Sequence, residues 1–194
     1  MRAFVIAMEC EADCVRPHLK DGDRLYVSGI GKVAAAAAAQ RAVCEGADEI
    51  WNAGLCGGFG DDIEVGDVFS VEKASEYDFD LAKLNGTAVG VVDGFNTPYF
   101  PFELVDGLQG RTLATGDHFT DSESDYGLIT QELKASLRDM EGAAIAHVCL
   151  LAGVKCRAVK CVTNVAGKGS MTGQYEDNKR ICLAKLSDVM AKVM

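Results

Sequence analysis

The sequence predicts an α/β fold. Short runs rich in β-branched or aromatic residues alternate along the chain with Ala- and Leu-rich stretches at helical spacing. The chain has 194 residues, of which 48% are hydrophobic and 25% charged, which is typical of a soluble globular protein with a substantial core. No internal repeat, low-complexity linker or block of like charge divides the sequence, so we expect residues 1–194 to form a single domain.

Seven segments are predicted strands because they are short runs rich in β-branched or aromatic residues. They are residues 2–7, 24–28, 49–53, 67–73, 87–93, 111–115 and 156–163. An aromatic stretch at 94–102 contains two of the three prolines and is predicted to be an irregular loop with unusual apolar exposure. It suits a subunit contact, a pocket lid or a loop folded onto its own core.

Four segments are predicted helices: residues 32–45, 122–134, 142–151 and about 174–193. Gly46 and Gly153 follow the first and third, where helix ends favour glycine, and Ser122 is a suitable N-cap for the second. The last helix carries an apolar stripe on one face, formed by Cys182, Leu186, Val189 and Val193.

The charge balance excludes several classes of partner. With 19 Lys and Arg against 29 Asp and Glu, the formal net charge is −10, so neither nucleic acid nor an anionic membrane is an expected partner. No apolar run approaches the ~20 residues of a membrane span, and Glu9 interrupts the N-terminus before a signal-peptide core. We therefore expect a soluble, cytoplasmic protein.

The eight cysteines indicate packing rather than chemistry. They lie mostly in apolar segments and form no C-x-x-C pair, so we expect reduced, buried thiols. Cys10 and Cys14 lie near His18, which is expected to be exposed, but this spacing matches no standard zinc site. We expect neither a metal nor an organic cofactor.

Polar and glycine-rich segments follow the predicted strands, where the loops of an α/β sheet converge on a ligand crevice. They contain Glu9 and Glu11, then residues 28–32 (SGIGK), 52–58 (NAGLCGG), 116–121 (GDHFTD), 140–142 (MEG) and 160–164 (KCVTN). Each has an ordinary structural explanation taken singly. Glycines serve tight turns, and Glu141 at a helix start favours the helix dipole.

The order of these segments resembles the nucleoside phosphorylase and nucleosidase superfamily. The motifs are AMECE (7–11), SGIGKVAA (28–35), NAGLCGG (52–58), GDHF (116–119), DMEGAAIAHVC (139–149) and TNVA (163–166), which together cover nearly the whole chain. The likeness is greatest to the 5′-methylthioadenosine/S-adenosylhomocysteine nucleosidases. The chain is shorter than a typical member, chiefly between Asp93 and Arg111.

The resemblance implies a fold and an activity. The fold is a three-layer α/β/α domain with a central twisted mixed sheet, and the usual assembly of the nucleosidases is a homodimer. The activity is cleavage of the N-ribosidic bond of a purine nucleoside such as 5′-methylthioadenosine or S-adenosylhomocysteine. Water is the implied nucleophile, and no cofactor is needed.

The resemblance also assigns roles around the ribose. Glu11 would hold and deprotonate the attacking water, and Glu141 would accept hydrogen bonds from the ribose hydroxyls. Met140 would pack under the sugar. Gly29 and Gly31 would let the backbone approach the reacting side.

A second group of residues is assigned to the base. Phe119 would stack on the purine, and backbone groups of His118 and Thr120 would read its edge. His147, by contrast, lies on a helical run and is expected to be a packed or interface residue.

Three residues depart from the nucleosidase pattern: Asn164 replaces an Asp, Lys160 an Arg and Leu55 a Ser. Asn164 matters most, because an amide cannot protonate the leaving base, and general-acid catalysis is worth about 10²- to 10⁴-fold. Its NH₂ group suits O6 of hypoxanthine or guanine, which favours a 6-oxopurine.

Two alternatives therefore stay open beside the nucleosidase. One is a 6-oxopurine nucleoside hydrolase or phosphorylase, acting on an inosine- or futalosine-like substrate. Phosphate would find only Lys32 and Lys160 near the site, and Glu11 would repel it, so water is favoured. Lys32 is most simply a solvated residue. The other alternative is a nucleoside-binding protein with impaired catalysis.

Overall fold

The computed structural model describes residues 1–119 and 124–194. The strands are β1 (Arg2–Ile6), β2 (Arg24–Val27), β3 (Glu49–Gly58), β4 (Val68–Glu76), β5 (Phe100–Pro101), β6 (Gly110–Thr115), β7 (Leu137–Asp139) and β8 (Lys155–Val165). The helices are α1 (Glu9–Val15), α2 (Lys32–Cys44), α3 (Ala82–Asn85), α4 (Ser124–Gly127), α5 (Gly142–Ala152) and α6 (Met171–Val193). A 3₁₀ turn (Arg16–His18) follows α1, and a π-helical turn (Leu128–Glu132) follows α4.

The sheet is mixed and curls on itself. β3 pairs with β8 in parallel and with β7 antiparallel, and β8 continues antiparallel to β4. β4 and β7 both pair in parallel with β6, so the five strands β3, β7, β6, β4 and β8 form a closed ring of pairings. β1 and β2 extend the sheet from β3 as a parallel wing.

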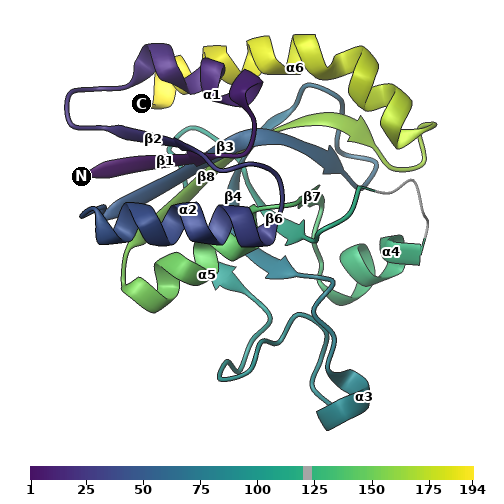
Figure 1. Cartoon of the computed structure of the whole chain (residues 1–194). Coiled ribbons are helices and arrows are strands. Elements are labelled where there is room, and N and C mark those ends of the chain that lie inside the picture. The colour runs from purple at the N-terminus through teal and green to yellow at the C-terminus, as the bar shows by residue number, and fades with distance from the viewer. Residues whose placement is uncertain (120–123) are drawn as a thin grey trace.

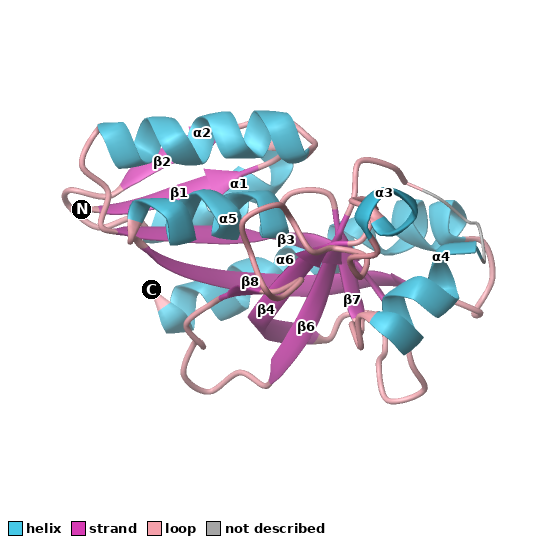
Figure 2. Ribbon diagram, turned by 90° about the horizontal axis from the view of Figure 1, so that it is seen from below, coloured by secondary structure: helices cyan, strands magenta, loops and turns pink. Residues whose placement is uncertain are grey.

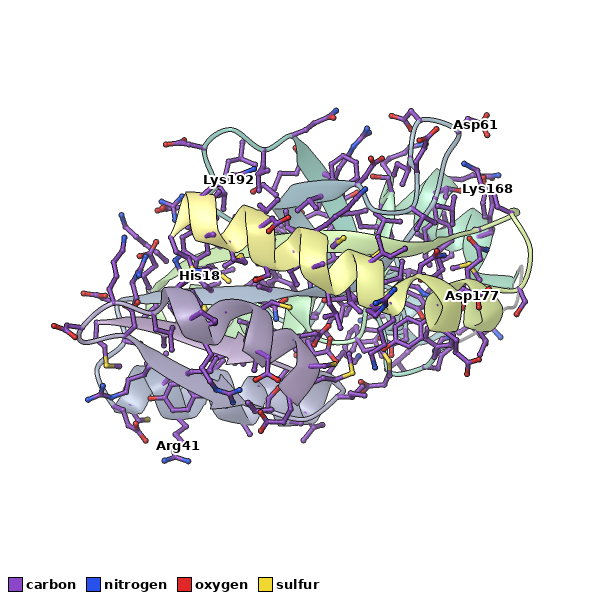
Figure 3. All side chains as sticks on the ribbon, turned by 90° about the horizontal axis from the view of Figure 1, so that it is seen from above. His18, Arg41, Asp61, Lys168, Asp177 and Lys192 are labelled. Atoms are coloured by element: carbon purple, nitrogen blue, oxygen red, sulfur yellow. The ribbon has the colours of Figure 1, made fainter. Side chains whose placement is uncertain are left out.

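Helices cover both faces of the sheet, as the sequence predicts (Figures 1 and 2). On one face α2 and α5 pack together over a core that includes Ala39, Ile50 and Ile145. On the other face α1 and α6 pack over Phe4 and Trp51. Figure 3 shows α6 lying beside α1, with Asp177 near its start and Lys192 near its end.

Local chemistry explains where the helices end. The backbone N–H of Gly153 donates to the last carbonyls of α5 from a left-handed conformation that glycine adopts without strain. Ser170 caps α6 by accepting a hydrogen bond from the Gly173 N–H at 3.2 Å. α6 therefore begins three residues before the predicted start, which places its first turns beside the cavity described below.

The predicted strand at 87–93 is wrong. Gly90 has φ +79°, and its N–H donates to the Phe79 carbonyl at 2.8 Å, while Val91 N–H donates to the Ala88 carbonyl. The Val91 bond closes a turn, and the Gly90 bond joins this segment to the chain eleven residues earlier, so residues 87–93 do not pair as a strand. The strands β5 and β7 were not predicted because two or three residues carry too little periodicity to be recognised.

β3 extends further than predicted. It continues through Gly58, because residues 54–58 pair with β8 instead of forming a loop. A Cβ at Gly54 would lie 2.7 Å from Glu11 Oε1, so glycine at this strand position leaves room for the Glu11 carboxylate. β8 contains Lys160, as predicted, and continues two residues beyond the predicted end, so Asn164 lies within the strand rather than after it.

The predicted helix at 122–134 is divided between α4 and the π-helical turn, while the Ser122 cap lies outside the described residues. Residues 94–99 are irregular, as predicted, whereas Phe100 and Pro101 form β5. Of the alternatives for this segment, the loop folded onto its own core agrees with the burial of Phe100 and Phe102 in the core. His147 is packed, as expected, with its ring stacked on Phe100 at 4.4 Å between centroids.

The cysteines are free thiols, and six of the eight are buried, whereas Cys44 is exposed and Cys10 is intermediate. Among the described residues, no group of three or more His, Cys, Asp or Glu side chains is arranged to hold a metal ion. His18 is partly buried rather than exposed. Across ranges 1–119 and 124–194, no helix combines the length and the apolar character needed to cross a membrane.

We predict that the α6 interface is a main contributor to folding stability. Leu186 is fully buried, so Leu186→Ala should lower the free energy of unfolding by about 2–5 kcal/mol in urea denaturation. Ile181, on the same helix, is 55% exposed, and Ile181→Ala should change it by less than about 0.5 kcal/mol. Equal effects of the two substitutions would contradict the packing described here.

Candidate active site

A cavity of about 360 Å³ opens where β3, β7 and β8 meet the starts of α1, α5 and α6. Seven of the residues singled out from the sequence line it: Glu11, Leu55, His118, Phe119, Met140, Glu141 and Asn164. These positions are separated by up to 153 residues in the chain. Tertiary folding thus brings most of the sequence-predicted site residues to one place.

Glu11 is a buried carboxylate held by backbone donors. Its side chain is 3% exposed, Oε1 accepts a hydrogen bond from Leu55 N–H at 2.8 Å, and Oε2 accepts one from Met8 N–H at 3.2 Å. Burial raises the pKa of Glu11 above its ordinary value, although the Leu55 hydrogen bond acts in the opposite direction. Leu55 contributes its backbone here, which explains why an apolar side chain is compatible with the position.

Glu141 is a second buried carboxylate, placed directly before α5. Its Oε1 accepts a hydrogen bond from Gly31 N–H at 3.0 Å. Gly31 has φ +101°, a conformation that glycine adopts far more readily than other residues. Burial, together with the nearby charge of Asp139, raises the pKa of Glu141 to about 7.

Behind these carboxylates lies a buried ion pair between Lys160 and Asp139. Lys160 Nζ is 2.7 Å from Asp139 Oδ2, and the two side chains are only 2% and 1% exposed. Thr115 Oγ1 donates to Asp139 Oδ1 at 2.6 Å, and Gly142 N–H donates to Oδ2 at 2.9 Å. Burial disfavours the Lys160 ammonium, but Asp139 and Glu141 outweigh it and raise the pKa of Lys160 to about 12.

Aromatic and amide side chains also line the cavity. The rings of Phe119 and Tyr175 meet edge-to-face at 5.7 Å, and Phe119 remains 48% exposed. His118 Nε2 lies 2.7 Å from Asp125 Oδ2. Asn164 Oδ1 accepts a hydrogen bond from Thr163 Oγ1 at 2.6 Å.

Several expected site residues do not line the cavity. The Lys160 ammonium faces Asp139 instead, and Gly29 and Gly31 adjoin the cavity without lining it. Thr120 lies outside the described residues. Lys32 is not simply solvated, because its Nζ lies 2.9 Å from Glu76 Oε2 and 2.7 Å from Asp78 Oδ1, which ties the start of α2 to the end of β4.

Sequence reasoning assigned no role to several residues that line the cavity: Met8, Ile30, Arg138, Asp139, Thr172 and Tyr175. Met8 and Asp139 stand inside the motifs quoted above, so their positions carried a signal. Thr172 lies before the predicted start of the last helix, and Tyr175 lies within that predicted helix, where nothing marked it as a cavity residue. Arg138 belongs to β7, which was too short to be recognised.

Comparisons with known proteins show the family to which the chain belongs. A model of the phosphorylase superfamily matches residues 21–194. The 5′-methylthioadenosine nucleosidase of Arabidopsis thaliana is 34% identical over 151 residues, which covers 76% of this chain and 55% of that protein. The 5′-methylthioadenosine/S-adenosylhomocysteine nucleosidase of Chromohalobacter salexigens is 32% identical over 158 residues, which covers 74% of this chain and 67% of that protein.

Solved structures share the fold. The 5′-methylthioadenosine/S-adenosylhomocysteine nucleosidase of Neisseria meningitidis, in complex with methylthio-immucillin-A, superposes with a TM-score of 0.86 at 23% identity, covering 99% of this chain and 97% of that one. This chain and that structure thus share a mixed α/β fold. The chain belongs to the phosphorylase superfamily, and both of the curated relatives named above are nucleosidases.

We predict a pH-dependent stability from Glu141. Its folded-state pKa of about 7 exceeds the ordinary value of 4.5, so the folded chain binds this proton more tightly than the unfolded chain. Protonated Glu141 therefore contributes fully to the free energy of unfolding below pH 4.5. This contribution, about 3 kcal/mol, is lost as the pH rises through 7.

Urea denaturation at pH 4.5 and pH 8 measures this contribution. Glu141→Gln should gain stability relative to the original chain on going from pH 4.5 to pH 8. Glu132, which is exposed, provides the control substitution Glu132→Gln, which should show no such change. An equal difference between Glu141→Gln and the original chain at both pH values would rule out the raised pKa.

Proposed function

We propose that this protein is a purine nucleosidase that hydrolyses the N-ribosidic bond of a purine nucleoside such as 5′-methylthioadenosine or S-adenosylhomocysteine. The observation that carries the proposal is the placement of two buried carboxylates, Glu11 and Glu141, in one cavity with Phe119 and Asn164. The names of the two nucleosidase relatives support the substrate class. We also propose that residues 1–194 form a single domain. The protein is proposed to be soluble in the cytoplasm and to assemble as a homodimer.

Glu11 is the proposed base for the attacking water. Its raised pKa increases its affinity for a proton, and a carboxylate with this property is an effective general base near neutral pH. The two backbone N–H groups hold the carboxylate in one orientation. A bound water could therefore be deprotonated as the ribose carbon accepts its oxygen and the C–N bond to the purine breaks.

Glu141 is the proposed ribose ligand. Gly31 N–H occupies Oε1, which leaves Oε2 to accept hydrogen bonds from ribose hydroxyls, and Met140 lines the cavity beside it. The negative charge of Glu141 would also stabilise the positive charge that develops on the sugar in an oxocarbenium-like transition state. Phe119 offers the ring for stacking on the purine, next to His118.

Hydrolysis is favoured over phosphorolysis because both lysines are already paired with carboxylates. Lys160 is paired with Asp139, and Lys32 is paired with Glu76 and Asp78. A phosphate dianion would have to compete with these carboxylates and approach Glu11 as well. Water carries no such penalty and is the proposed nucleophile.

Asn164 favours a second candidate within the same reaction. Its amide lines the cavity but has no acidic proton to deliver, whereas its NH₂ group is a donor that suits O6 of a 6-oxopurine. The second candidate is thus a 6-oxopurine nucleoside hydrolase. A chain that binds nucleosides without turnover is the outcome to expect if neither reaction is found.

Chromatographic detection of free base tests the proposal. The protein is incubated with 5′-methylthioadenosine, S-adenosylhomocysteine, adenosine, inosine and guanosine, each with and without phosphate. We expect phosphate-independent release of base, and Glu11→Gln should reduce kcat by about 10²- to 10⁴-fold because the general base is lost. Release that requires phosphate would identify a phosphorylase, and no release from any nucleoside would refute the proposal.

Asn164→Asp should create the missing acid. A carboxylic acid at this position can protonate the leaving purine, so adenine release from 5′-methylthioadenosine should rise by about tenfold or more. Asn96→Asp, at an exposed loop position, makes the same chemical change away from the cavity and should leave the rate unaltered. No gain in Asn164→Asp, with folding intact by circular dichroism, would exclude Asn164 from the base end of the site.

A further inference from the structure

Arg138 is a buried arginine at the cavity that the proposed reaction does not yet use. It is 7% exposed and lines the cavity from β7. Its Nη1 lies 3.8 Å from Asp125 Oδ2, the same oxygen that lies 2.7 Å from His118 Nε2. Its Cζ also lies 6.0 Å from the centroid of the Phe59 ring. Because the side chain lines the cavity, its guanidinium is placed where it can donate to an acceptor group of a bound ligand.

The sheet register places Arg138 opposite Asn164. Gly57 on β3 pairs with Asn164 on β8 and with Arg138 on β7. Residues paired across neighbouring strands project to the same face of a sheet, so Asn164 and Arg138 flank Gly57, with their backbones about 10 Å apart. A Cβ at Gly57 would lie 3.3 Å from Met171 Cε and 3.5 Å from Asn164 Nδ2, so glycine at this position lets both side chains pack against β3.

Arg138 and Asn164 line the same cavity as His118 and Phe119, which are proposed to bind the purine. Asp125 connects His118 to Arg138 through its carboxylate. The carboxylates Glu11 and Glu141 belong to the ribose end. The base end therefore combines a guanidinium and an amide.

We propose that Arg138 reads position 6 of the purine and, together with Asn164, selects 6-oxopurine nucleosides over 6-aminopurine nucleosides. The inference rests on the proposed nucleosidase function. A guanidinium has five N–H donors and no acceptor, so it complements the acceptor O6 of hypoxanthine or guanine. The 6-amino group of adenine is a donor, and it would leave buried donors facing one another.

The same cation would act on the leaving group. As the C–N bond breaks, its electron pair moves onto the purine, and O6 of a 6-oxopurine takes part of the negative charge. Arg138 would stabilise that charge without transferring a proton, which matters because Asn164 has none to give. Selectivity for 6-oxopurines and release of the base thus depend on the same side chain.

The test uses two nucleosides that differ only at position 6: 5′-methylthioinosine and 5′-methylthioadenosine. We expect the original chain to cleave the 6-oxo compound with a kcat/KM about tenfold to a hundredfold higher than that for 5′-methylthioadenosine. This factor corresponds to the free energy of one hydrogen bond to a charged group. Arg138→Met should remove most of this preference by lowering kcat/KM for the 6-oxo compound alone. A preference for 5′-methylthioadenosine in the original chain would overturn the inference.

Arg111→Met is the matched control. Arg111 also lies over a phenylalanine ring and pairs with an aspartate, Asp62, but it does not line the cavity. Its substitution should leave the ratio of the two kcat/KM values unchanged. If Arg138→Met lowers both rates equally, as Arg111→Met would through a general loss of structure, Arg138 has only a structural role and the inference fails.

Binding of free bases separates this inference from the proposed function. If no nucleoside is cleaved, the nucleosidase proposal fails, but calorimetric titration with hypoxanthine and adenine still tests Arg138. Hypoxanthine should bind about tenfold more tightly than adenine, and Arg138→Gln or Arg138→Met should abolish the difference. Equal affinities for the two bases in the original chain would contradict the inference even where catalysis is confirmed.

Discussion

The structure depends on the buried ion pair between Lys160 and Asp139. Two charges inside a protein are costly unless each is closely matched, and here Thr115 and Gly142 supply the remaining hydrogen bonds to the carboxylate. The pair joins β8 to β7, while Thr115 adds β6. Removing either charge would leave the other buried and unpaired, at a cost of about 3–5 kcal/mol. The ion pair therefore stabilises the ring of strands close to the carboxylates Glu11 and Glu141.

Close approach of backbone and side chains is the second condition for this site. Gly54 leaves room for the Glu11 carboxylate, and Gly57 leaves room beside Asn164. Both glycines lie within the paired strand β3, where they cost conformational entropy and contribute no side-chain packing. The side chains of Glu11, Asn164 and Met171 occupy the places that a Cβ at these positions would need. The two glycines that make room for Glu11 and Asn164 therefore also lower the stability of β3.

The residues proposed to bind the ribose and those proposed to bind the base differ in electrostatic character. The proposed ribose ligands are near the buried carboxylates Glu11 and Glu141, whereas the proposed base ligands include a guanidinium, an amide and an aromatic ring. This polarity suits a reaction in which positive charge develops on a sugar and negative charge on a departing base. It also explains how the chain could dispense with a protonated acid at Asn164.

Local signals in the sequence, periodicity and glycine placement, predicted the α/β class, most strands, the helices α2 and α5, most of α6, and seven residues that line the cavity. What depends on distant partners became visible only in the folded chain. Residues 87–93 form no strand, and Gly90 bonds to Phe79 instead, whereas β3 extends to Gly58 because β8 lies beside it. Lys160 faces Asp139, and Arg138 faces the cavity, because strand pairing sets which residues of separate segments become neighbours. No local pattern encodes that register, since it emerges only when the ring of strands closes.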